Sequence, residues 1–422
     1  MDEAPLKTDL AALADIASIP HQSEVTETTF LHALIERIEE ECPRRESTSP
    51  DEEKAQDILG DELAACGLDV EKFSFRYSRS LYSVLALHYA IATLGSAFYL
   101  WQPLVGTALH LFVAVAYAID CYYRGFILRR CVPWGTSHNI VARLPATGAT
   151  RRRVVFIGHA DAAPTGWMFA PAFLHRFHKP WPNSLYLLRK QMLGSTLALL
   201  LLATLGVIRA TTGYWFPFMY YGFTLASLIP LILLLQIVWT NRTVPGANDN
   251  LTGCAAVVLL ADRFAARPLP DTECVFVITG CEEAGRGGAW ALEQQMRGEW
   301  DPKTTTIIGL DTLSGGQLRY HVEGEILPIW PSKKLVQAMH TVAAEDERFA
   351  GIAEYHAPAG ATDVAPFVCQ GYDGACLTRI DPKNDLPPNY HVPEDTVANV
   401  NATDVRDAVD FAERLARVLA AS

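Results

Sequence analysis

The sequence predicts an α/β protein whose mixed, mainly parallel sheet is covered by helices on both faces and interrupted by two inserted transmembrane helical hairpins. Three observations lead to this prediction. Short apolar runs of strand character alternate with helical patterns, as in sheets of this class. Two long stretches have almost no charge, and the whole chain is 50% apolar but only 19% charged. Histidine and acidic side chains follow several of the predicted strands.

The polar part of the chain begins with a capped helix. Ser49 suits the N-cap, Pro50 the first helical position and Glu52 a capping box, while Gly67 ends the helix. Alternating strands and helices follow. The predicted strands are 68–75, 139–144, 154–158, 274–279, 306–310 and 375–380, and the predicted helices are 251–266, 288–297, 332–345 and 403–420.

Two charge-poor stretches predict the hairpins. Residues 80–119 contain no Asp, Glu, Lys or Arg, and residues 191–241 contain only Arg209. Each stretch is long enough for two spans of about 20 residues, the length that crosses a hydrocarbon core. The predicted spans are 81–101 with 103–119 and 191–208 with 214–239, joined by turns at 101–103 and 209–213. The hairpin segments are then 81–125 and 191–240, and one catalytic domain comprises 1–80, 126–190 and 241–422.

The charges that flank the spans predict a cytoplasmic catalytic domain. Hairpins return the chain to the side it left, so all polar parts share one side of the membrane. That side carries Arg76, Arg79, Arg124, Arg129, Arg130, Arg176, Lys179, Arg189, Lys190 and Arg242, and the other side has only Arg209. The positive-inside rule places the richer side in the cytoplasm. The nine cysteines include no CxxC pair, which favours a reducing compartment.

Candidate catalytic residues gather at three strand ends. His159 and Asp161 follow the run 154–158, Glu282 and Glu283 follow 274–279, and Asp311 follows 306–310. Open α/β sheets bind ligands at the carboxyl ends of their strands. We therefore expect these side chains to share one site.

Two further residues extend this set. Asp249 precedes a predicted helix, and His391 lies in a late loop. Imidazole and carboxylate groups suit zinc. Because the set holds more carboxylates than histidines, it also suits two neighbouring ions with a carboxylate between them.

The ordered motifs HAD, GANDN, CEEAG, LD and HVPEDT resemble the co-catalytic, two-zinc aminopeptidases, the group that includes bacterial leucyl aminopeptidases, the peptidase domain of glutamate carboxypeptidase and glutaminyl cyclases. The resemblance covers about 45–80 and 136–420 and implies two Zn²⁺ ions per chain. By position it implies one zinc held by His159, Asp249 and Asp311, and a second held by Asp249, Glu283 and His391. It also implies that Glu282 is the general base and that Asp161 orients His159.

Together with the predicted hairpins, the resemblance implies an integral membrane aminopeptidase that hydrolyses N-terminal peptide bonds with a zinc-activated water. The hairpins leave open a membrane-embedded deacylase of N-acyl amino acids or lipids; a glutaminyl cyclase-like enzyme and an inactive membrane scaffold are further alternatives. The expected partners are a peptide or amphipathic amide substrate and the lipid bilayer, with homo-oligomers possible. The net charge of −12 argues against nucleic acid.

The sequence departs from the family pattern in two places. Soluble members have a short crossover between the HxD motif and the bridging Asp, whereas this chain carries the second hairpin there. The membrane is therefore expected close to the active site. The stretch 362–367 resembles a substrate-pocket segment in which His often follows Asp, but this chain has Val364 after Asp363.

Overall fold

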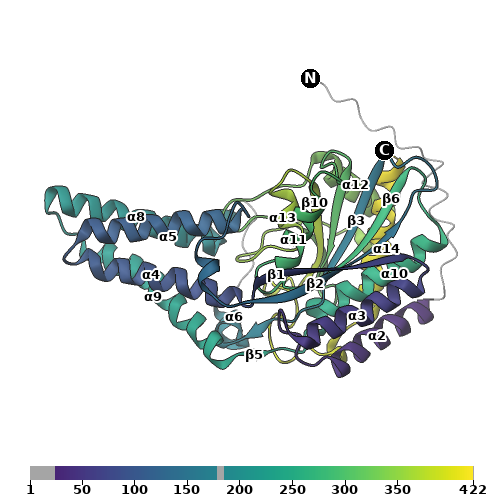
Figure 1. Cartoon of the computed structure of the whole chain (residues 1–422), viewed down its shortest axis with the longest axis horizontal. Helices are drawn as coiled ribbons and strands as arrows, with labels where there is room; N and C mark the ends of the chain where they lie inside the picture. Colours follow the sequence, from purple (N-terminus) through teal and green to yellow (C-terminus); the bar gives the residue numbers. More distant parts are fainter. Residues whose placement is uncertain (1–23, 178–184, 422) are drawn as a thin grey trace, which may run out of the picture.

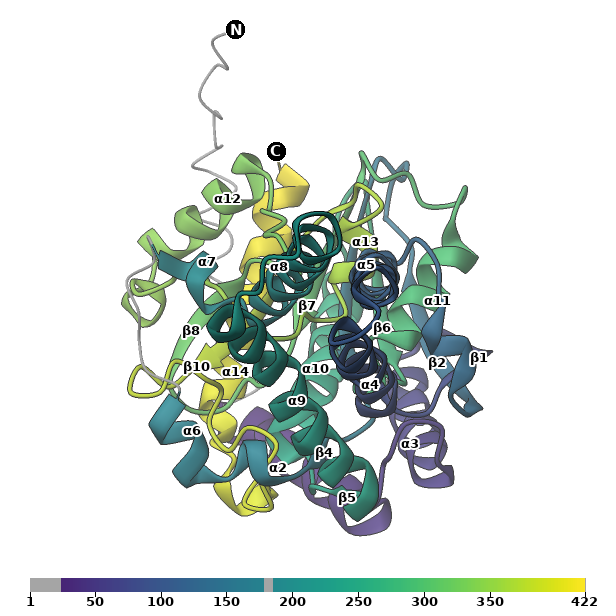
Figure 2. The same ribbon diagram turned by 90° about the vertical axis from the view of Figure 1, so that its left-hand side faces the viewer.

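The computed structural model describes residues 24–177 and 185–421, with side chains described for 24–174 and 185–421. It consists of an α/β domain built on an eight-stranded sheet and four long helices that project together from one side of that domain (Figure 1). Viewed from that side, the four helices stand end-on in front of the domain (Figure 2). The predicted fold class is confirmed. The predicted flanking cation Lys179 and the side chain of Arg176 lie outside the described part.

The sheet has the strand order β1-β2-β6-β3-β7-β10-β8-β9. Four of its seven pairings are parallel and three are antiparallel, so the sheet is mixed and mainly parallel. The strands are β1 Asp69–Ser78, β2 Trp134–Leu144, β3 Arg152–His159, β6 Thr272–Thr279, β7 Thr305–Leu310, β8 Gln317–His321, β9 Glu354–Tyr355 and β10 Asp373–Ile380, with the short pair β4 Pro164–Thr165 and β5 Arg242–Thr243 beside the sheet.

Three strands differ from the prediction because pairing, not composition, sets their extent. β2 begins at Trp134 because it pairs with β1 along its full length, Ser78 lying opposite Trp134. β8 and β9 were not predicted. β8 is short and partly polar, and it forms because its backbone pairs antiparallel with β10.

Helices cover both faces of the sheet. Alternate residues of β3 point to opposite faces of the sheet. Phe156 packs in the core beneath α10, whereas Val155 and Ile157 pack in a second core beneath α11. The helices of the first face are α2 Glu24–Glu41, α3 Pro50–Ala65, α10 Thr252–Ala266, α12 Lys333–Ala344 and α14 Ala402–Ala421; those of the second are α11 Gly287–Met296 and α13 Ala365–Val368.

The four projecting helices are α4 Leu81–Tyr99, α5 Pro103–Cys121, α8 Gln191–Thr212 and α9 Pro217–Thr240, each long and apolar enough to cross a membrane. The short helices α6 Pro171–Phe177 and α7 Tyr186–Arg189 precede α8 in the chain. Two bounds correct the predicted hairpins. Arg209 lies inside α8, not in the turn, because the helix continues to a left-handed C-cap at Gly213, φ 77°. α5 continues past residue 119 because Asp120 pairs with buried Arg129 at 2.7 Å.

Close packing within the bundle follows from small residues. A side chain on Gly106 would lie 2.6 Å from the carbonyl oxygen of Gly95, so the close approach of α5 to α4 at this point requires glycine at position 106. The two histidines of the first hairpin make internal contacts. His88 Nδ1 lies 2.8 Å from the Val84 carbonyl, and His110 Nε2 lies 3.1 Å from that of Ala92.

The first hairpin is tied to the catalytic domain through Arg129. Its guanidinium donates to Asp120 at the end of α5, to Ser78 Oγ at the end of β1 (2.8 Å) and to the carbonyl of Ala284 (2.6 Å). Ala284 follows the Glu282–Glu283 pair directly. The membrane-type helices therefore join the domain next to its candidate catalytic loop.

Candidate metal centre

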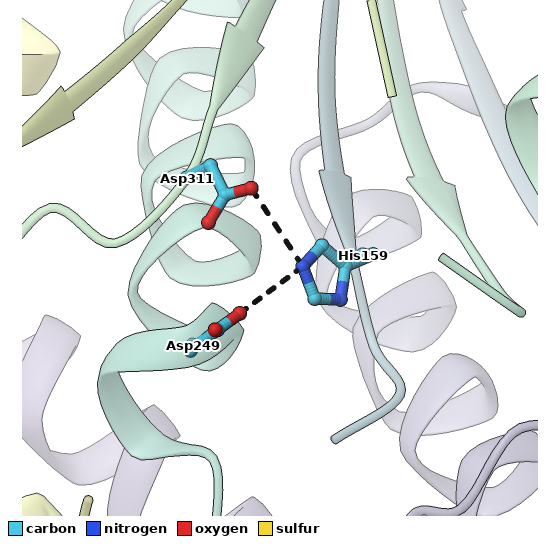
Figure 3. Close-up of side chains that lie close together, drawn as sticks. All are labelled: His159, Asp249 and Asp311. Carbon is cyan, nitrogen blue, oxygen red and sulfur yellow. Dashed lines mark ion pairs between the residues drawn. The ribbon is translucent and has the colours of Figure 1, made fainter. Parts of the chain in front are cut away.

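The predicted ligands come together at one edge of the sheet. His159 is the last residue of β3, Asp311 follows β7, and Asp249 lies in the turn that leads into α10 (Figure 3). Glu283 lies in the loop after β6, and His391 lies in the loop after β10. The parallel strands β6, β3 and β7 are neighbours, so their carboxyl ends bring these side chains together.

The distances between donor atoms fit two ions that share Asp249. Its Oδ1 lies 3.4 Å from His159 Nε2, and its Oδ2 lies 3.2 Å from His391 Nε2. His159 Nε2 is also 3.8 Å from Asp311 Oδ2, and His391 Nε2 is 3.5 Å from Glu283 Oε1. Ligands about 2.0–2.2 Å from a tetrahedral zinc lie about 3.3–3.6 Å apart. The side chains thus form two groups of zinc-type spacing, one on each oxygen of Asp249.

The electrostatics of the cluster call for cations. Burial, together with the charge of Asp249, raises the pKa of Asp311 to about 8 and that of Glu283 well above its ordinary value. Burial also raises the pKa of Glu282 strongly. For Asp249 the contacts with His159 and His391 outweigh burial and lower the pKa. Buried carboxylates this close repel one another, and divalent cations between them offset that repulsion.

Asp161 is fully buried and contacts both His159 and the acidic loop. His159 Nδ1 lies 3.1 Å from the backbone carbonyl of Asp161 and 3.5 Å from its carboxylate. The carboxylate accepts the backbone N–H groups of Glu282 and Glu283, each at 3.0 Å, and the hydroxyl of Ser47 at 2.7 Å. Asp161 therefore fixes the Glu282–Glu283 turn as well as lying against His159.

Asp395, which the sequence analysis did not assign to the site, holds the turn of Asp249. Its carboxylate accepts the backbone N–H of Asn248 at 2.7 Å and of Asp249 at 3.1 Å, and its side chain is buried. Glu52 acts in the same way on the acidic loop and accepts the N–H of Cys281 at 2.7 Å. The HVPEDT and capping-box motifs contain these residues, but neither motif reveals the distant amide that is bound.

Backbone strain also concentrates here. Cys281, Thr312 and His391 have φ values of 54°, 51° and 56°, a region that non-glycine residues rarely adopt. Each is a candidate ligand or lies within one residue of Glu282 or Asp311. Strain of this kind persists where surrounding contacts hold a side chain in a required direction.

The ring of His391 lies in an aromatic setting that the sequence analysis missed. Tyr390 lies 3.9 Å and Phe169 4.6 Å from it, centroid to centroid. The hydroxyl of Tyr82, in the first turn of α4, lies 3.3 Å from His391 Nδ1. Phe169 ends a short turn, Trp167–Phe169, whose Trp167 N–H donates to Gln236 of α9 at 2.8 Å. α4 thus contacts a candidate ligand directly, and α9 is linked to it indirectly through the Trp167–Phe169 turn.

Comparison with known proteins agrees with this geometry. Residues 237–416 match peptidase family M28, a stretch that contains every candidate ligand except His159. No curated protein matches the chain in sequence.

The fold is similar to solved structures of two kinds, aminopeptidases and glutaminyl cyclases. A zinc aminopeptidase from Bacillus subtilis superposes with a TM-score of 0.56 at 13% identity, over 92% of this chain and 94% of that one. An aminopeptidase from Aneurinibacillus sp. strain AM-1 gives 0.54 at 14% identity, over 92% and 93%. A glutaminyl cyclase from an Acidobacteriales bacterium gives 0.54 at 13% identity, over 99% of each chain.

The resemblance to the co-catalytic zinc aminopeptidases is confirmed. The family match and the fold together support a hydrolase, and more closely a zinc metallopeptidase.

Proposed function

We propose that the chain is an integral membrane aminopeptidase that hydrolyses N-terminal peptide bonds at a centre of two zinc ions. The observation that carries the proposal is the geometry of Asp249, whose two carboxylate oxygens face His159 on one side and His391 on the other at 3.4 and 3.2 Å. One ion is held by His159, Asp249 and Asp311, and the other by Asp249, Glu283 and His391. When bound, the zinc pair polarises the substrate carbonyl and lowers the pKa of a water molecule.

Glu282 is the proposed general base. Its carboxylate lies beside the centre, within 4.8 Å of ligand atoms of His159 and Glu283, and it is only partly buried. Burial raises its pKa, which suits a group that takes a proton from water and returns it to the leaving amine. Asp161 holds the N–H of Glu282 and so fixes the direction of this carboxylate.

The spans and their surroundings support integration into a membrane. The bundle displays large apolar side chains along its length, among them Leu111, Val115, Leu200, Leu225 and Ile232. Trp239 near the domain end of α9 is also exposed, as are five apolar residues of the domain, namely Trp167, Leu187, Leu188, Leu327 and Trp330. Aromatic and leucine side chains at this level suit the membrane interface.

The first experiment combines metal content with catalysis. Elemental mass spectrometry on protein purified in mild detergent without chelator should find about two zinc ions per chain, and fewer in Asp249→Ala. Glu282→Gln should retain the zinc yet lose about 10²–10⁴-fold in peptide hydrolysis, the usual contribution of a general base. The exposed, distant Glu299→Gln is the matched control.

Full activity in Glu282→Gln would refute the assignment of the base. One zinc per chain would favour a glutaminyl cyclase-like enzyme, and none after zinc is added back would favour a scaffold.

One observation favours a second substrate class. Trp167 is exposed and lies two residues from Phe169, which packs on His391. Apolar surface this near the metal centre would suit the acyl chain of an N-acyl amino acid or lipid. Higher kcat/KM for long-chain N-acyl amides than for aminoacyl amides would establish the deacylase alternative.

The proposed orientation places the catalytic domain in the cytoplasm. Cys131 is exposed on the domain side of the first hairpin and can report this. An impermeant maleimide should label Cys131 only after the membrane is permeabilised, with Cys131→Ser as the background. A cysteine introduced at exposed Tyr214, at the far end of the bundle, should react in intact cells.

A further inference from the structure

His391 has a hydrogen-bond partner on each side of its ring. Nε2 faces Asp249 and Glu283, and Nδ1 lies 3.3 Å from the hydroxyl of Tyr82. A histidine that binds a metal through Nε2 carries its proton on Nδ1, and that N–H needs an acceptor. The phenol oxygen of Tyr82 is placed to accept it, and both side chains are buried.

We infer that Tyr82 is a positioning residue for His391, so that the first transmembrane helix is a structural part of one half of the metal centre. The inference rests on the proposed two-zinc site and names a residue that the family motifs do not contain. It makes the first hairpin more than an anchor, because the helix itself supplies the group that orients a ligand.

The position of Tyr82 is fixed from two directions. Only two residues, Arg79 and Ser80, separate the end of β1 from the start of α4, and Ser80 Oγ caps the helix by accepting the N–H of Ser83 at 3.1 Å. The tyrosine ring then packs edge-on against Phe169, with centroids 6.2 Å apart. Since Phe169 also packs on His391, the phenol, the phenyl and the imidazole form one contact group.

Among the residues that the structure describes, the other half of the centre shows no such link to the spans. His159 Nδ1 lies 3.1 Å from the backbone carbonyl of Asp161, which is two residues away in the same strand-end loop. The two histidines therefore differ in what orients them: a local carbonyl for His159 and a membrane helix for His391. Loss of the Tyr82 hydroxyl should weaken one zinc ion and leave the other unchanged.

The test measures the two zinc affinities separately. Wild type, Tyr82→Phe and Tyr89→Phe are purified in the same detergent and titrated with a chromophoric chelator of known zinc affinity. In Tyr82→Phe one zinc step should weaken by about 10–100-fold, as is usual when the partner of a ligating histidine is lost. The second step should match wild type. In cobalt-substituted protein, the visible absorption of one ion alone should change.

Tyr89→Phe is the matched control. Tyr89 lies two turns further along α4, and its hydroxyl donates to Ser195 at 2.8 Å, away from the centre. The Tyr89→Phe substitution also removes a tyrosine hydroxyl from α4, and it should leave both zinc affinities and the cobalt spectrum unchanged. Equal melting temperatures of the two variants would show that the helix still packs.

Three results overturn the inference, and they differ in what they leave standing. If wild type binds two zinc ions and Tyr82→Phe binds both with wild-type affinity and spectrum, the two-zinc function stands and the role of Tyr82 is wrong. Equal weakening of both steps would also exclude a role specific to His391. If wild type binds no zinc, the proposed function itself fails and the inference falls with it.

Discussion

Replacing Asp395 by asparagine should weaken zinc binding although Asp395 is not a proposed ligand. Its two carboxylate oxygens accept the N–H groups of Asn248 (2.7 Å) and Asp249 (3.1 Å), which orients the turn that carries Asp249. The asparagine side chain has one carbonyl oxygen and can accept only one of these two N–H groups. Its NH₂ group would then face the other N–H, donor against donor. A hydrogen bond to a charged group contributes about 1.5–3 kcal/mol. Because 1.4 kcal/mol corresponds to a tenfold change, zinc affinity should fall roughly 10- to 100-fold.

The assay is competition with a chromophoric chelator in detergent, and the control is Glu394→Gln. Glu394 is the adjacent residue, and its side chain is exposed. Its backbone carbonyl accepts hydrogen bonds from the Asn399 side chain at 2.8 Å and the Thr396 N–H at 2.9 Å, and the substitution leaves this carbonyl in place. Since Asp249 is shared, both zinc steps should weaken in Asp395→Asn, unlike the single step expected for Tyr82→Phe. Wild-type zinc affinity in Asp395→Asn would refute the view that this carboxylate sets the position of Asp249.

Three further predictions concern the bundle and the metal. Arg129→Met leaves buried Asp120 unpaired and should cost about 3–5 kcal/mol, seen as a lower melting temperature, whereas the exposed neighbour Arg130→Met should be neutral. Gly106→Ala places a methyl group 2.6 Å from the Gly95 carbonyl oxygen and should destabilise the protein by about 1–3 kcal/mol. The control Gly222→Ala, whose methyl group meets open space, should have no such effect. Equal melting temperatures of the two variants would contradict the close α4–α5 contact. Dialysis against EDTA should abolish hydrolysis and lower the melting temperature. Adding zinc at a hundredfold excess over its Kd should restore activity and raise the free energy of unfolding by about 2.7 kcal/mol. Activity that survives complete zinc removal would exclude a metal mechanism.

The sequence predicted which candidate ligands would lie together, and for two of them the signal was local. His159 and Asp311 come directly after buried apolar strands, and the carboxyl ends of neighbouring parallel strands necessarily meet. Asp249 and His391 have no such local signal, and the prediction for them depended on the order of the motifs. The structure brings all four together, but their role as ligands remains a prediction.

The residues that orient the ligands could not be predicted. Tyr82 suits the aromatic belt of a span, and nothing in its neighbourhood indicates a contact with a histidine 309 residues away. Asp395 suits an ordinary turn, because the amides it binds belong to a distant loop. The extents of α8 and β2 were wrong for related reasons: a C-cap glycine and a strand partner set them, and an apolar pattern reports neither.

The placement of the hairpins also bears on how the protein is made. Along the chain His159 precedes the second hairpin, while Asp249, Glu283, Asp311 and His391 all follow it. On the proposed topology all four spans are synthesised before Asp249, the residue that the two proposed zinc ions share. Neither proposed zinc site can then be complete before both hairpins have been synthesised, so zinc loading follows the synthesis of the membrane part.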